Sequence, residues 1–138
     1  MKILINASLN LRGGGLQVTL SFILHCLNYN NHSFIIVAGD NVYNELESFS
    51  FPSNFLIIKV PKLKFYQFDK VLGKIEDEHK PDIAISTFGP VYWRPKVKHI
   101  MGFAAGHHIY GDSPFWKRIS VLEKLKWMVK RKIHLTSF

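Results

Sequence analysis

Two adjacent histidines are the residues of this sequence best suited to acid–base chemistry. His107 and His108 stand five and four residues before Asp112, respectively. An imidazole titrates near neutral pH, so either ring can act as a general acid or base. Consecutive side chains diverge, so the pair does not predict a shared metal ion, and we expect neither a metal centre nor a cofactor. Loop histidines without a catalytic role are the alternative interpretation.

A run of three glycines, Gly13, Gly14 and Gly15, has the composition of an anion-binding turn. Glycines let the backbone approach a ligand closely, and the free N–H groups and dipole of a helix that begins there attract a phosphate. A sugar hydroxyl suits the same groups. Val18 stands where a dinucleotide-binding motif has its third glycine, so that motif matches poorly. The alternative is a tight turn that serves only helix–strand packing.

A third segment, residues 86–94, combines hydroxyl, aromatic and guanidinium groups. Carbohydrate is a suitable ligand, because its C–H faces stack on aromatic rings while its hydroxyls form hydrogen bonds. A loop that packs on its own domain or on a neighbouring molecule is the alternative. The candidate acceptor-binding residues are Ser86, Thr87, Phe88, Gly89, Tyr92 and Arg94.

The positive charge is concentrated in the last third of the chain. The formal net charge is +8; residues 91–138 contain ten basic and two acidic side chains, whereas residues 1–90 contain eight of each. Apolar residues recur at helical spacing among these lysines and arginines, at Phe115, Ile119, Leu122, Leu125 and Val129. The pattern predicts an amphipathic helix that either faces the core or docks on anionic lipid.

The candidate membrane-binding residues are Trp116, Lys117, Arg118, Lys124, Trp127, Lys130 and Arg131. Nucleic acid is not an expected partner, because no helix-turn-helix, zinc or RNA-binding sheet motif is present.

Apolar runs and helical periodicities alternate along the chain and define the elements that must position these residues. We expect strands over residues 2–6, 34–38, 55–60, 82–86 and 99–103, and helices over 16–27, 40–49 and 68–78. Asp40 is the expected N-cap of the second helix, and Asp112-Ser113-Pro114 is expected to begin the last one. Strands joined by helical crossovers predict an α/β fold, a Rossmann-like parallel sheet with helices on both faces.

The composition is typical of one globular domain over residues 1–138, with 47% hydrophobic residues and a single cysteine. Cys26 has no partner for an internal disulfide, which favours a reducing cytoplasm. No apolar stretch is long enough to span a bilayer. We therefore expect a cytoplasmic location, peripheral at the inner face of the membrane if the basic segment docks on lipid.

Four segments, in order, carry a family resemblance: residues 2–7 (KILINA), 13–18 (GGGLQV), 80–83 (KPDI) and 86–90 (STFGP). Together they resemble the N-terminal domain of bacterial GT-B glycosyltransferases of the retaining group that builds surface polysaccharides. The resemblance covers nearly the whole chain. It implies two Rossmann-like domains facing a cleft, of which this chain matches the acceptor-side one, while the donor-binding domain with its paired glutamates is expected to be absent.

The resemblance further implies a nucleotide-sugar donor and a glycan or lipid-linked acceptor. It puts the glycine run near the donor diphosphate, residues 86–94 near the acceptor, and makes His107 or His108 the nearest match to a histidine that follows the fifth strand in many members. Catalysis needs donor and acceptor held together, so this chain alone is expected to be inactive.

Two other function classes stay open. The first is a non-enzymatic module that docks on anionic membrane or a partner protein through its basic C-terminal helix. The second is a dinucleotide-binding oxidoreductase. An incomplete Rossmann half exposes a sheet edge and an apolar helix face, so a homo-oligomer is also an expected partner.

Overall fold

The computed structural model describes residues 1–9, 11–89, 91–102 and 112–135, and of residues 129–135 it describes the backbone. Its strands are β1 (Lys2–Ala7), β2 (Ser33–Ala38), β3 (Phe55–Lys59), β4 (Ile83–Ser86) and β5 (Lys98–Met101). Its α-helices are α1 (Gly14–His25), α2 (Asp40–Leu46), α3 (Phe68–His79) and α4 (Val121–Leu135). Short 3-10 helices are η1 (Cys26–Asn28), η2 (Phe65–Gln67) and η4 (Pro114–Lys117).

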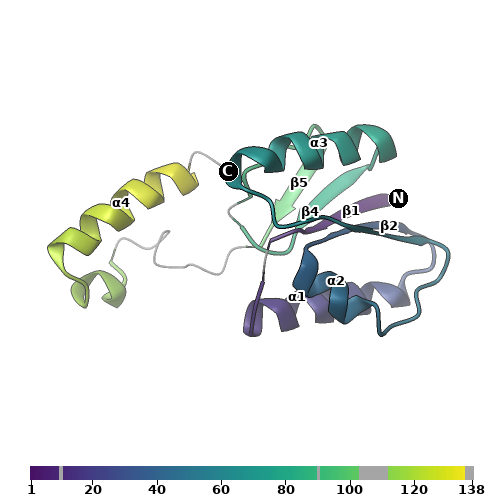
Figure 1. The fold of residues 1–138 in the computed structure, drawn as a ribbon, viewed down its shortest axis with the longest axis horizontal. Coiled ribbons are helices and arrows are strands. Elements are labelled where there is room, and N and C mark those ends of the chain that lie inside the picture. Colours follow the sequence, from purple (N-terminus) through teal and green to yellow (C-terminus); the bar gives the residue numbers. More distant parts are fainter. Residues whose placement is uncertain (10, 90, 103–111, 136–138) are drawn as a thin grey trace.

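The five strands form one parallel sheet in the order β3-β2-β1-β4-β5. The chain moves outward from β1 to β3 on one side and then crosses over to β4 and β5 on the other. Helices α1 and α2 cover one face and α3 covers the opposite face (Figure 1). This arrangement confirms the expected Rossmann-like α/β fold with helices on both faces.

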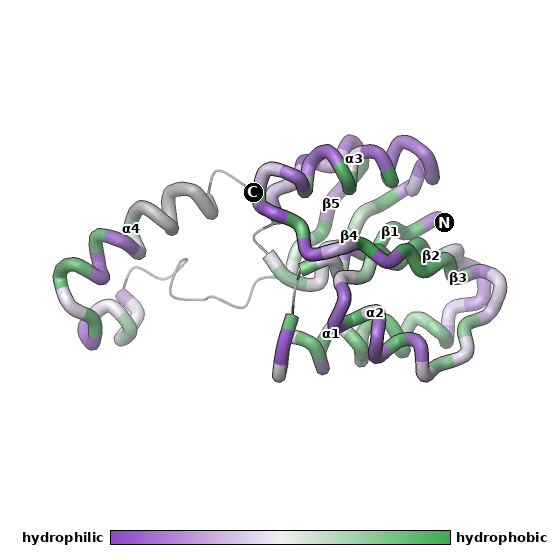
Figure 2. Tube along the Cα trace, viewed as in Figure 1, coloured by the Kyte–Doolittle hydropathy of each residue, from purple (hydrophilic) through white to green (hydrophobic). Residues whose placement is uncertain are grey.

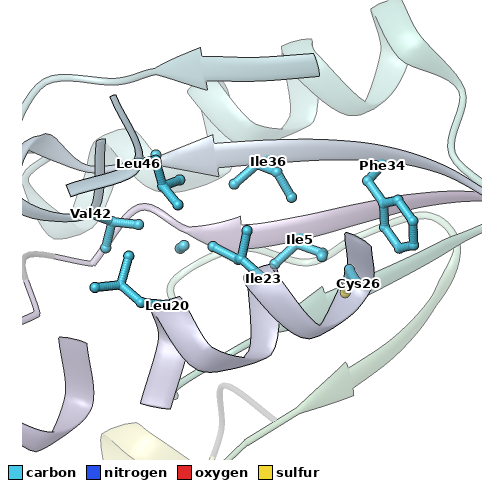
Figure 3. Packing of buried hydrophobic residues seen from close by; sticks show 10 residues of the cluster. Ile5, Leu20, Ile23, Cys26, Phe34, Ile36, Val42 and Leu46 are labelled. Carbon is cyan, nitrogen blue, oxygen red and sulfur yellow. The ribbon is translucent and has the colours of Figure 1, made fainter. Parts of the chain in front are cut away.

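Two apolar layers hold the helices to the sheet. On one face Ile5 and Ile36 pack against Ile23 of α1 and Leu46 of α2 (Figure 3). On the other face Leu72 of α3 packs against the alternate residues of the same strands. Hydrophobic residues are concentrated in the strands, while α3 is mostly hydrophilic on its outward side (Figure 2). Burial on both faces explains why β1 and β2 are continuous apolar runs rather than alternating ones.

Two expected helix starts are wrong. The N-cap of α2 is Gly39, and Asp40 is the first helical residue, where its carboxylate lies 4.0 Å from Lys59 Nζ. The second error concerns the last helix.

Ser113 and Pro114 begin only the 3-10 turn η4, in which the Ser113 hydroxyl accepts from the Phe115 backbone N–H. The α4 helix begins after Ser120, which forms a reciprocal capping box with Glu123: Glu123 N–H donates to Ser120 Oγ at 3.3 Å, and Ser120 N–H donates to the Glu123 carboxylate at 3.0 Å. Because this second cap interrupts the expected helix, Phe115 and Ile119 do not belong to the apolar face of α4.

Candidate functional site

The most favourable place for a ligand is the carboxyl edge of the sheet where β1 and β4 lie side by side. These neighbours pair in parallel from Ile3↔Ile83 to Asn6↔Ser86, and the loop after β1 leads away to α1 while the loop after β4 leads toward β5. At such a switch point the two loops diverge, and open α/β sheets bind ligands in the crevice between them.

The glycine turn after β1 presents an uncapped helix N-terminus. Gly13 has φ +54°, a conformation that L side chains rarely adopt, and it is the N-cap of α1 without a side-chain hydrogen bond. The first turn of α1 contains no acidic residue, and a Cβ added at Gly14 would meet no atom within 4 Å. The turn therefore offers backbone N–H groups and the positive end of the helix dipole to open space.

The segment after β4 lies against this glycine turn. A Cβ added at Gly15 would stand 3.8 Å from a ring carbon of Phe88, and the Thr19 hydroxyl of α1 donates to Thr87 Oγ1 at 3.1 Å. The structure therefore brings together the glycine run and the first part of the segment that the sequence singles out for carbohydrate.

A buried polar chain supports the same corner. The Ser8 hydroxyl donates to Asn6 Oδ1, Asn6 Nδ2 donates to Ser86 Oγ at 3.1 Å, and Ser86 Oγ lies 2.8 Å from His99 Nε2. Asn6, Ser8 and Ser86 are buried, so the Ser86 hydroxyl belongs to this internal chain rather than to the open surface. The chain ties β1, β4, β5 and the start of the glycine loop into one unit.

His99 is half-buried at the end of this chain. Its Nε2 lies 2.8 Å from Ser86 Oγ, and the imidazole tautomer decides which of the two groups donates. Burial lowers the pKa of His99 below its ordinary value of 6.5, and the nearby Glu76 carboxylate opposes that shift. A Ser–His pair is also the arrangement of nucleophilic catalysis, but a buried Ser86 suits positioning rather than attack on a substrate.

Acidification is expected to destabilise the fold through His99. The folded pKa is lowered, so the unfolded chain takes up this proton first as the pH falls below 6.5, and stability is lost until the folded pKa is reached. We expect the free energy of unfolding, measured by urea titration between about pH 7.5 and 5, to fall more steeply in the wild type than in His99→Gln. The glutamine amide can still form a hydrogen bond with Ser86, as donor or acceptor, but does not titrate. Identical slopes in the two proteins would contradict this prediction.

Three residues of the 91–97 loop lie on the α3 side of the sheet. Tyr92 packs near Phe68, with ring centroids 6.2 Å apart, and the Arg94 backbone N–H donates to Asp69 at 3.1 Å. Trp93 between them is buried in the α3 core. The packing alternative therefore describes this part of the segment, whereas Thr87 and Phe88 contact α1 and its glycine turn.

Sequence reasoning missed Glu76, which fastens the 91–97 loop. Its Oε1 accepts from the backbone N–H groups of Lys96 at 2.6 Å and Val97 at 3.1 Å, although the side chain is only 3% exposed. Its Oε2 and Trp93 Nε1 are buried without a hydrogen-bond partner among the described residues. An acid inside the run Glu76-Asp77-Glu78 looks like an ordinary surface charge, but Glu76 stands four residues after Leu72, so the helical period places it on the buried face of α3.

The candidate membrane-binding residues lie in η4, in the turn after it and in α4. Trp116 and Lys117 belong to η4, Arg118 follows it, and Phe115 joins it to α4 through an edge-on contact with Trp127, with centroids 5.5 Å apart. No helix in the described part of the chain has the length and apolar character needed to cross a bilayer.

Some candidates fall outside what the structure describes. His107 and His108 lie outside the described residues, and Lys130 and Arg131 belong to the part of α4 of which only the backbone is described. No protein-family model, curated protein or solved structure matches this chain. The geometry of the β1–β4 corner is therefore the basis of the proposed function.

Proposed function

We propose that this chain is the acceptor-side domain of a glycosyltransferase that transfers a sugar from a nucleotide-sugar donor to a glycan or lipid-linked acceptor. The observation that carries the proposal is the contact between an uncapped glycine turn and a hydroxyl- and aromatic-containing loop, at the carboxyl ends of β1 and β4. The glycine turn is suited to a diphosphate, and the loop after β4 is suited to a sugar.

The two features suit the donor diphosphate and the acceptor sugar respectively. The first turn of α1 contains no acidic side chain to repel a diphosphate, and the space around Gly14 is open. Phe88 lies beside Gly15, so an acceptor sugar next to that diphosphate can stack on an aromatic ring. Buried hydrogen bonds from Asn6 to Ser86 and between Ser86 and His99 connect the strands that carry both loops.

A charge placed at Gly14 tests the proposal. We expect UDP-glucose to perturb the backbone NMR signals of Gly14, Gly15 and Thr87, and Gly14→Glu to weaken this binding at least tenfold. The carboxylate would occupy the space of the diphosphate, yet it would stabilise α1, because an acid is favourable in the first turn of a helix. Lost binding would therefore not be explained by lost folding.

The matched control is Gly14→Ala, which adds a methyl group to the same open space without charge. It is expected to keep most of the affinity. Equal binding by Gly14→Glu and the wild type, or perturbations confined to other parts of the chain, would overturn the proposal. Binding of NAD with an affinity above that of UDP-glucose would instead support the oxidoreductase alternative.

A further inference from the structure

Part of one face of the sheet carries no helix among the described residues. Helices α1 and α2 lie over β1, β2 and β3, while α3 lies on the opposite face, so the α1-side face of β4 and β5 has no covering helix among the described residues (Figure 1). Ile85 and Ile100 pair across these two strands and point to that face, where Ile100 is 51% exposed.

An apolar groove follows this uncovered face beside α1. It consists of two hollows of about 240 and 260 Å³ that share Phe22 of α1 and Ile85 of β4. Gly102 lies at one end of the groove and His32 near the other. The lining includes no lysine or arginine and is almost entirely apolar. Such a groove is suited to the apolar face of an amphipathic helix.

Helix α4 carries an apolar face of the required kind. The side chains of Val121, Leu122, Leu125 and Met128 are all exposed, with Leu122 at 75% and Leu125 at 58%. They recur at helical spacing and form one stripe, here called the α4 stripe. The Ser120–Glu123 capping box gives α4 its own N-terminal stop, and the helix stands apart from the sheet (Figure 1).

We propose that the groove beside α1 receives the α4 stripe of a second copy of this chain, so that two protomers exchange their C-terminal helices. Each protomer offers one uncovered groove and one uncovered stripe, and a reciprocal exchange covers all four surfaces in a closed two-fold dimer. The α4 stripe runs from Val121 to Met128, and α1 borders the groove from Val18 to His25, so each covers eight residues, or about 12 Å of helix. The lengths therefore match.

Charge and size favour a copy of this chain as the occupant. The groove lining contains no lysine or arginine. Lys124 and Lys126, which lie among the stripe residues in sequence, therefore meet no like charge in the lining. A stable dimer removes about 1,600 Å² of surface from water. Two helix-in-groove contacts contribute to that area in an exchanged dimer, whereas a helix folded back on its own groove makes one.

The molar mass in solution tests this proposal. We expect sedimentation to show a dimer for the wild type at tens of micromolar, and Leu125→Asp or Ile100→Asp to raise the dimer dissociation constant at least tenfold. Both residues are half exposed, so a charge at either one is not expected to unfold the protomer, which circular dichroism checks. Phe65→Asp is the matched control: Phe65 is exposed but lies outside both surfaces, and the variant is expected to remain dimeric.

Mixing the two variants distinguishes a specific loss of the helix exchange from a loss of solubility or of the folded structure. Leu125→Asp keeps an intact groove and Ile100→Asp keeps an intact stripe, so their equimolar mixture is expected to form a mixed dimer through the one remaining contact. A wild type that is monomeric at every concentration, or a dimer unaffected by Leu125→Asp, would overturn the proposal. So would a monomeric wild type that binds anionic vesicles through the α4 stripe, since that result assigns the stripe to lipid.

Discussion

Replacing Gly102 by alanine is expected to lower the free energy of unfolding by about 3 kcal/mol, at the upper end of the cost of overpacking a core. A Cβ at this position would lie 2.4 Å from the Thr87 carbonyl oxygen and 3.2 Å from its carbon, and both belong to the backbone. A flexible side chain could turn away from the methyl group, but backbone must shift as a unit. Urea denaturation followed by circular dichroism measures the loss.

The same substitution is expected to damage the candidate site. Gly102 N–H donates to the Ser86 carbonyl at 2.9 Å, and the Gly102 carbonyl accepts from Gly89 N–H at 2.8 Å. These two bonds hold the loop after β4 in its position beside the glycine turn. A shifted loop should therefore lose affinity for UDP-glucose as well as stability, which titration of the folded fraction would detect.

Gly73→Ala is the internal control for Gly102. Gly73 lies within α3, a Cβ there would meet nothing within 4 Å, and alanine is the better helix former. We expect this variant to gain about 0.5–1 kcal/mol. A Gly102→Ala variant as stable as the wild type, together with a stabilised Gly73→Ala, would contradict the close approach of the Gly102 backbone to the Thr87 carbonyl.

Replacing Asn6 by alanine is expected to cost about 2–4 kcal/mol, because it removes the centre of the buried polar chain. Asn6 Oδ1 accepts from both the N–H and the hydroxyl of Ser8, and its amide donates to Ser86. The variant leaves those groups buried with fewer partners. Thermal and urea unfolding give the magnitude, and the NMR signals of Ser8 and His99 should move together, because the chain connects them.

A surface asparagine provides the comparison. Asn28 is exposed and donates one hydrogen bond to the His25 carbonyl at 3.1 Å, so Asn28→Ala is expected to change stability by about 0.5 kcal/mol or less. Similar losses in the two variants would mean that the Asn6 chain contributes no more than an exposed cap. A change at Ser8 without one at His99 would mean that the chain is not continuous through Ser86.

Much of the fold follows from local pattern. The continuous apolar runs at Leu4 and Ile36 predict strands covered on both faces, and the 3.6-residue period through Leu20 and Ile23 predicts α1, because each pattern reports how often a side chain must face the core. The errors arose where two local signals competed. Ser113-Pro114 and Ser120 are both valid helix starts, and only the folded chain shows that the second one begins α4.

The site depended more strongly on tertiary structure. The sequence singled out Gly13 to Gly15 and the segment after β4 by composition. It contained no signal for the contact of Gly15 with Phe88 or for the Ser86–His99 pair, and only the helical period after Leu72 pointed to the buried position of Glu76. Each of these depends on strand register or helix placement.

The alternation of strands and helices follows from local sequence pattern, and it fixes the α/β class and the edge of the sheet at which a ligand can bind. The tertiary structure decided which side chains meet there. Asn6 and Ser86 stand 80 residues apart and become neighbours only through the parallel register of β1 and β4. Local periodicity records whether a residue is buried, but pairing across a sheet is a property of two distant segments at once.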